Sequence, residues 1–96
     1  MRITQKDLQN TVNRINSMFN LPSEPYIKNE LTGKLEPQAG VFLLDMAYGG
    51  VKLSRMSLDK GCTGQSNITG GFDTKKVCYD KMQAFIRGIE IERELA

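Results

Sequence analysis

Few residues in this chain of 96 could carry out chemistry, because it has no histidine and only two cysteines. The lack of histidine excludes Ser-His-Asp and Cys-His activation of a nucleophile and removes the commonest zinc ligand. Cys62 and Cys78 have no further ligands at the spacing that zinc requires, so we expect two free thiols, with Cys78 in the core. The sequence therefore predicts neither a metal site nor a cofactor.

The eleven carboxylates are scattered along the chain. No two of them form the pair within an apolar segment that acid–base hydrolysis needs. Asp45 alone lies inside an apolar run, and we expect it to pair with Lys52 on a solvated face, because no second catalytic group accompanies it. We therefore predict that the protein is not an enzyme.

Basic residues offer an alternative site for a nucleic acid or another anion. Glycines precede a predicted helix start at Gly70-Gly71, but the order of a P-loop is missing and Asp73 would repel an anion there. A wider patch would form if the central hairpin, the following loop and the second helix start meet; its members would be Lys52, Arg55, Lys60, Lys75 and Lys76. The net charge is only +2, so charge by itself does not indicate nucleic acid.

A central β-hairpin would position many of these residues. The densest apolar run lies in residues 40–57, and Gly49-Gly50 interrupts it where a tight turn would need positive φ. Strands over about 35–47 and 51–57 would then pair with Tyr48 opposite Val51. One face is apolar and is expected to meet the helices, whereas the other is a candidate partner surface that includes Val41, Leu43 and Met56.

Two helices complete the predicted core. The first spans about 4–19, with Thr4 as N-cap and Asn20 in the left-handed conformation at its end, and its apolar stripe is Leu8, Val12, Ile15, Met18 and Phe19. The second spans about 74–94, and its stripe is Cys78, Met82, Phe85, Ile86 and Ile89. Both stripes would pack on the apolar face of the hairpin.

A second, weaker apolar line runs along another side of the second helix. We call it the outer line; it consists of Val77, Ala84, Gly88, Ile91 and Leu95. A helical glycine lowers stability by about 1 kcal/mol relative to alanine and often permits another backbone to approach closely. The outer line is therefore either a contact for a partner or a homodimer, or a scatter of exposed apolar residues at a fraying helix end.

The remaining segments connect these elements. A short strand is expected over about 25–29, and Thr32-Gly33 predicts a turn; Pro37 then requires a sheet edge or a break. Residues 58–73 form a long aperiodic loop that would be either functional or mobile. We predict a single α+β domain over residues 1–96: a helix, a meander of three or four antiparallel strands, and a second helix, with both helices on one face of the sheet.

No apolar run is long enough to span a membrane and no secretion signal begins the chain, so we expect a cytoplasmic protein without membrane contact. Several segments together resemble small accessory proteins encoded by tailed phages and prophages: Met-Arg-Ile-Thr-Gln-Lys-Asp-Leu-Gln at the start, Glu24-Pro25-Tyr26, Asp45-Met-Ala-Tyr-Gly-Gly, and Met82-Gln-Ala-Phe-Ile-Arg-Gly-Ile-Glu90. The resemblance covers nearly the whole chain and includes no catalytic residue. It implies a protein that acts by binding another protein in the bacterial host cytoplasm, including inhibition of a host defence or nucleic-acid-processing complex, as anti-CRISPR proteins do.

Overall fold

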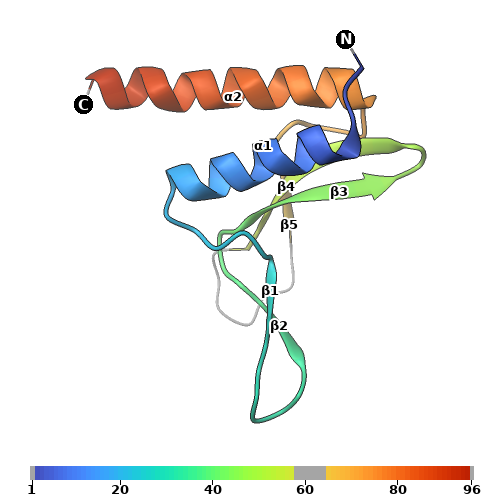
Figure 1. The fold of residues 1–96 in the computed structure, drawn as a ribbon, viewed down its shortest axis with the longest axis vertical. Helices are drawn as coiled ribbons and strands as arrows, with labels where there is room; N and C mark the ends of the chain where they lie inside the picture. The colour runs from blue at the N-terminus through green and yellow to red at the C-terminus, as the bar shows by residue number, and fades with distance from the viewer. Residues whose placement is uncertain (1, 58–64, 96) are drawn as a thin grey trace.

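The computed structural model describes residues 2–57 and 65–95. Its elements in chain order are α1 (Gln5–Met18), β1 (Tyr26–Lys28), β2 (Leu35–Pro37), β3 (Phe42–Ala47), β4 (Gly50–Met56), β5 (Gln65–Asn67) and α2 (Lys75–Leu95). The strands form two antiparallel sheets, β1-β2 and β3-β4-β5. Both helices lie on the same side of the three-stranded sheet, and the β1–β2 hairpin projects away from it (Figure 1). The predicted α+β class, with a helix before and after the strands, is confirmed.

Helix α1 begins with a reciprocal cap and ends at a left-handed residue. The hydroxyl oxygen of Thr4 accepts a hydrogen bond from the Asp7 N–H at 3.2 Å, and the Asp7 carboxylate accepts one from the Thr4 N–H at 2.9 Å. Asn20 has a φ of 57°, which ends the helix as predicted. Leu8, Val12 and Ile15 are fully buried, whereas Phe19, expected in the same stripe, is exposed at the helix end.

The core lies between the two helices and the first two strands of the larger sheet. On α2, Cys78, Met82 and Ile86 are buried, and the Thr74 hydroxyl accepts a hydrogen bond from the Val77 N–H at the helix start. The three buried side chains of α2 join Phe42, Val51, Leu53 and the buried apolar residues of α1 in one cluster. The hairpin face predicted to be apolar is therefore the face that the helices cover. Each fully buried aliphatic side chain of this kind contributes about 1.5–3 kcal/mol of transfer free energy.

The register of the β3–β4 hairpin differs from the prediction by two residues. Met46 pairs with Val51 and Ala47 with Gly50, so the turn consists of Tyr48 and Gly49, with φ values of 53° and 73°. Gly50 instead lies in β4, where the backbone of Asp73 passes so closely that an added Cβ would lie 3.0 Å from its carbonyl oxygen. This close approach requires a glycine within the strand. A shift of two leaves every side chain on its predicted face.

The predicted strand over 35–47 is broken into β2 and β3, and the predicted single meander is two sheets. β2 ends at Pro37, whose missing N–H would face away from β1, and Gly40 then turns the chain with a φ of 77°. Among the strands of residues 2–57 and 65–95, β1 and β2 pair only with each other. Separation of this hairpin from the larger sheet creates the main protrusion of the molecule.

The predicted loop over 58–73 lies partly outside the described residues, which resume at residue 65. From there the chain is not irregular: β5 pairs with β4, the Ile68 N–H donates to the Leu53 carbonyl, and Asp73 forms a bridge with Val51. The polar sequence of this strand has no apolar alternation. Its conformation depends on the second edge of β4, which would otherwise leave backbone groups unpaired.

Candidate functional site

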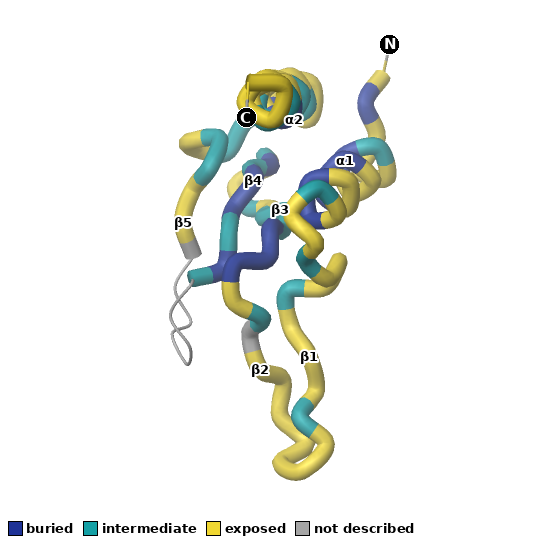
Figure 2. Tube along the Cα trace, turned by 90° about the vertical axis from the view of Figure 1, so that its left-hand side faces the viewer, coloured by how far each residue is buried: buried dark blue, intermediate teal, exposed yellow. Residues whose placement is uncertain are grey.

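The β1–β2 hairpin is the most exposed structured part of the chain. We call residues 25–38 the arm. Its two strands pack on each other, and neither has an extensive contact with another helix or strand. Figure 2 shows the arm as an almost entirely exposed projection from the body. The radius of gyration is accordingly 14.2 Å, compared with about 12.5 Å for a compact chain of this length.

Hydrogen bonds give the arm a defined shape without a core. At its tip, the side chain of Asn29 accepts from the Leu31 N–H at 2.9 Å and donates to the Glu36 carboxylate at 2.8 Å. At its base, Gln38 donates its backbone N–H to the Pro25 carbonyl and its side-chain amide to the Glu24 carbonyl, both at 2.7 Å. The arm is therefore held at both ends by polar contacts.

The arm nevertheless carries large apolar side chains. Ile27 is 55% exposed, Leu35 69% and Leu31 96%. A groove of about 440 Å³ lies at its base, lined mainly by Pro22, Tyr26, Ile27, Lys28, Leu35 and Gln38. Sequence reasoning located a hairpin here but assigned no site residues to it. One feature of the sequence could have indicated this exposure: the apolar residues of the two short strands are isolated from one another and lie beside prolines and charged residues.

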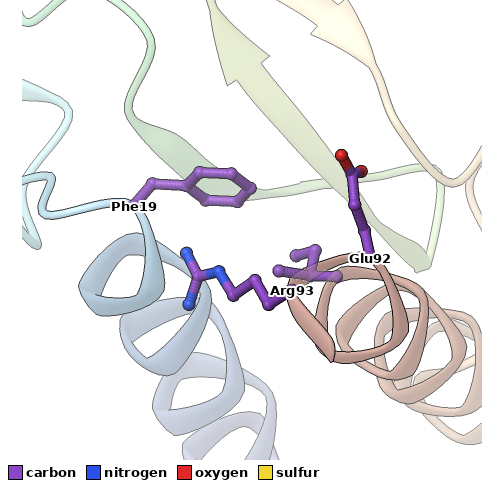
Figure 3. A pocket seen from close by; sticks show the side chains of 4 residues that line it. Phe19, Glu92 and Arg93 are labelled. Atoms are coloured by element: carbon purple, nitrogen blue, oxygen red, sulfur yellow. The ribbon is translucent and has the colours of Figure 1, made fainter. Parts of the chain in front are cut away.

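A smaller groove lies where the ends of α1 and α2 meet (Figure 3). It has a volume of about 270 Å³ and is lined by Phe19, Ile89, Glu92 and Arg93. Phe19 and Arg93 point toward each other, with the guanidinium 5.8 Å from the ring centroid, and Arg93 also donates to the Met18 carbonyl. These contacts join the two helix ends, and the groove has room for a small apolar group.

The sheet face predicted to receive a partner is largely closed. Val41 and Met56 are fully buried and Leu43 is half-buried, so this part of the prediction is wrong. Val41 and Met56 are paired at the base of the β3–β4 hairpin, where the Met56 N–H donates to the Val41 carbonyl, and both side chains lie inside the body there. The ion pair that was expected on this face is present, with Lys52 Nζ 3.9 Å from the Asp45 carboxylate.

The outer line of α2, in contrast, is uncovered. Val77, Ile91 and Leu95 are all exposed. Gly88 is exposed too, and a Cβ added there would meet no atom within 4 Å. Packing among the described residues therefore gives no reason for a glycine at this position. The outer line remains a surface that a second molecule could contact.

The predicted basic patch does not assemble from its described members. Lys52 and Arg55 lie on opposite faces of β4: Lys52 donates to the Asn67 side chain at 2.7 Å, whereas the Arg55 guanidinium lies over the Phe42 ring on the helix-covered face. Lys60 lies outside the described residues. Lys75 and Lys76 are exposed at the start of α2, where Lys76 pairs with Asp80 at 2.7 Å. A continuous anion-binding surface through Lys52 and Arg55 is thus excluded by strand geometry.

Cys78, the described cysteine, is buried. Burial is the main cause that raises the pKa of its thiol, and the negative charge of Asp73 is the second. Cys62 lies outside the described residues. No cluster of three or more carboxylates and thiols suited to a metal occurs within residues 2–57 and 65–95. Neither described helix combines the length and apolar character needed to cross a membrane.

The fold and these surfaces define a small α+β body with a projecting, partly apolar hairpin. No protein-family model, no curated protein and no solved structure matches the chain.

Proposed function

We propose that the protein is a non-enzymatic accessory protein that binds another protein through the arm. The observation that carries this proposal is the exposure of Ile27, Leu31 and Leu35 on a hairpin without an extensive contact with another helix or strand. An isolated two-stranded hairpin is marginally stable in water, and its apolar side chains gain free energy only when a second surface covers them. A protein surface with apolar depressions would supply that cover.

The charges of the arm favour a protein over a nucleic acid or an anionic membrane. Between residues 26 and 37 it carries Lys28 and Lys34 against Glu30 and Glu36. Phosphate-rich partners attract surfaces with a clear excess of basic residues. A balanced, partly apolar surface is instead typical of protein interfaces, whose centres are depleted of charge and whose rims are polar.

The biological setting that we propose is a phage-encoded protein acting on a complex in the bacterial host cytoplasm. This part rests on the resemblance of the sequence to phage and prophage accessory proteins. The specific form is inhibition of a host defence or nucleic-acid-processing complex. It predicts that expression of the protein in bacteria with an active CRISPR defence restores plating of a targeted phage, and that an arm variant does not.

Affinity capture from bacterial lysate tests the binding proposal directly. The bait is the full chain, compared with an arm variant, Ile27→Ser with Leu35→Ser, and with an α2 variant, Ile91→Lys. All three substituted residues are exposed, so the variants are expected to fold. We expect one host protein or complex to be enriched by the wild type and the α2 variant and lost with the arm variant. Enrichment that is equal for all three baits would contradict the assignment to the arm.

A further inference from the structure

The arm has two outer edges, and their backbone groups are not equivalent. The Asn29 N–H donates to the Lys34 carbonyl at 2.8 Å, and the Gln38 N–H donates to the Pro25 carbonyl. In an antiparallel pair, hydrogen-bonded positions alternate with positions whose N–H and C=O groups point away from the partner strand, so Ile27 faces β2 as Pro25 and Asn29 do. On β1 the residues that point away are Tyr26 and Lys28, whose backbone groups have no hydrogen-bond partner within residues 2–57 and 65–95.

The outer edge of β2 is blocked, in contrast to that of β1. Its outward-facing residues are Leu35 and Pro37, the partners of Lys28 and Tyr26 in the register. Pro37 has no N–H, so it costs the hairpin no hydrogen bond at this position and leaves the outer edge without a donor there. A further strand can therefore pair in full register only with β1.

A groove lies beside the open edge. Tyr26 and Ile27 both line this groove, and Pro22 forms part of its wall. Because successive strand residues point to opposite faces, the groove extends around the edge of β1. A strand added to β1 would thus place its backbone against Tyr26 and Lys28 and its apolar side chains in this groove. Backbone pairing provides affinity and the groove selects the side chains, as in other cases of strand addition.

On the basis of this geometry, and resting on the proposed function, we infer that the arm binds its partner by accepting an extended segment of that protein as an added strand on β1. Glu24 and Glu30 flank β1 on either side. Antiparallel pairing with β1 of a second copy about Ile27 would set Glu24 against Glu30, and opposed like charges destabilise a strand pair. A partner strand with an apolar centre and basic residues at its ends fits both the groove and these carboxylates.

The test uses a displayed library of random linear twelve-residue peptides, selected on the full-length protein. Selected peptides are then measured against Lys28→Pro, which removes an outward N–H, and Lys28→Ala, which changes the same side chain and keeps the N–H. Lys28→Ala measures the effect of losing the side chain, which lines the groove. Loss of the backbone bond and the clash of the proline ring are expected to make binding to Lys28→Pro at least about tenfold weaker than binding to Lys28→Ala. Hydrogen exchange at the Asn29 and Gln38 amides confirms that the arm stays paired in both variants.

Two further readouts separate strand addition from other modes of arm binding. Bound peptide is expected to slow hydrogen exchange at the Tyr26 and Lys28 amides and not at Leu35. N-methylation of successive peptide residues is expected to abolish binding at alternate positions only, since every second N–H of an added strand faces β1. Peptides that need the arm but bind Lys28→Pro as tightly as Lys28→Ala would overturn strand addition. Protein binding by the arm would then still stand. If no selected peptide depends on the arm, strand addition is also wrong, whereas the lysate capture still decides the proposed function.

Discussion

The side-chain amide of Asn16 pairs with both backbone groups of Phe42. Its nitrogen donates to the Phe42 carbonyl at 2.9 Å, and its oxygen accepts from the Phe42 N–H at 2.8 Å. Asn16 is fully buried, so neither group has water as an alternative. Helix α1 therefore supplies at the start of β3 the two hydrogen bonds that another strand would otherwise make. At the start of β3, the edge of the larger sheet therefore has its backbone groups paired. The outer edge of β1 in the arm, by contrast, has backbone groups that are unpaired within the described part of the chain.

Substitution Asn16→Ala is expected to destabilise the protein by about 2–5 kcal/mol, because two buried backbone groups lose their partner at once. Urea unfolding followed by circular dichroism measures the change. The control is Asn13→Ala, which removes an exposed hydrogen bond to Gln9 from the same helix and should change stability by less than about 0.5 kcal/mol. Equal effects of the two substitutions would show that the Asn16–Phe42 pairing contributes little.

The two glycines at positions 50 and 88 are expected to respond to alanine in opposite directions. In Gly50→Ala the new methyl group would lie 3.0 Å from the Asp73 carbonyl oxygen and from the Cβ of Phe72, and such overpacking costs roughly 1–3 kcal/mol. In Gly88→Ala the methyl group meets nothing, so the gain in helix propensity should stabilise the fold by about 1 kcal/mol. Thermal unfolding of both variants checks the signs. A destabilised Gly88→Ala would point to a contact at the outer line that a methyl group obstructs.

Self-association through the outer line of α2 is the homodimer form of the binding hypothesis. It predicts that the mean molar mass from light scattering rises with concentration and that Ile91→Lys, which places a charge on the exposed line, returns it to that of a monomer. Ile27→Lys on the arm is the matched control and should leave the mass profile unchanged. A wild type that stays monomeric at high concentration, with Ile91→Lys identical to it, excludes this homodimer.

The Thr4–Asp7 cap of α1 makes the free energy of unfolding depend on pH in the acidic range. Hydrogen bonds from the backbone and hydroxyl of Thr4 hold the pKa of Asp7 below its ordinary value. A lowered folded-state pKa means that the contribution is present above the unfolded pKa of about 4 and is lost as the pH falls through the folded value. Thr4→Ala removes the hydroxyl bond and keeps the backbone N–H, so it is expected to raise the pKa of Asp7 part of the way to its ordinary value, measured by carbon NMR of its carboxyl group, and to reduce the loss of stability in acid. An unchanged pKa in Thr4→Ala would contradict the role of the cap.

Removal of the arm should leave the body folded. Pro25 and Gln38 are hydrogen bonded at its base, so a short Gly-Ser-Gly turn can replace residues 26–37. Because the arm has no extensive contact with another helix or strand, the free energy of unfolding is expected to change by no more than about 1 kcal/mol. Urea unfolding measures this, and the same protein used as bait should lose the captured partner. A collapse of stability would show that the arm belongs to the folding unit.

Features that depend on neighbours in sequence could be predicted from the sequence. Thr4 and Asp7 cap α1 from three residues apart, and Asn20 ends the helix by its own left-handed conformation. The position of the β3–β4 turn could not be predicted, because the need for a glycine at residue 50 comes from Asp73, which is distant in sequence. Local pattern also suggested a Gly-Gly turn, which the close approach of Asp73 overrides.

The same contrast applies to the sites. The exposure of Ile91 and the other residues of the outer line followed from helical periodicity alone. The burial of Val41 and Met56 did not, since the alternation along a strand assigns side chains to a face and does not say which faces are covered. Nor could the arm be recognised as separate, because Pro37 was compatible either with the edge of one larger sheet or with a break.

The hydrogen bond between Gln38 and Pro25 has a consequence for how this protein can change over generations. It joins the two ends of the arm irrespective of the side chains beyond it, and the body keeps its core in α1, α2, β3 and β4. Substitutions in the arm are therefore nearly free of selection for folding, and what constrains them is the surface they meet. A lineage could redirect such a protein to a new target by rewriting a dozen residues, and an engineer could graft a foreign hairpin at the same two positions.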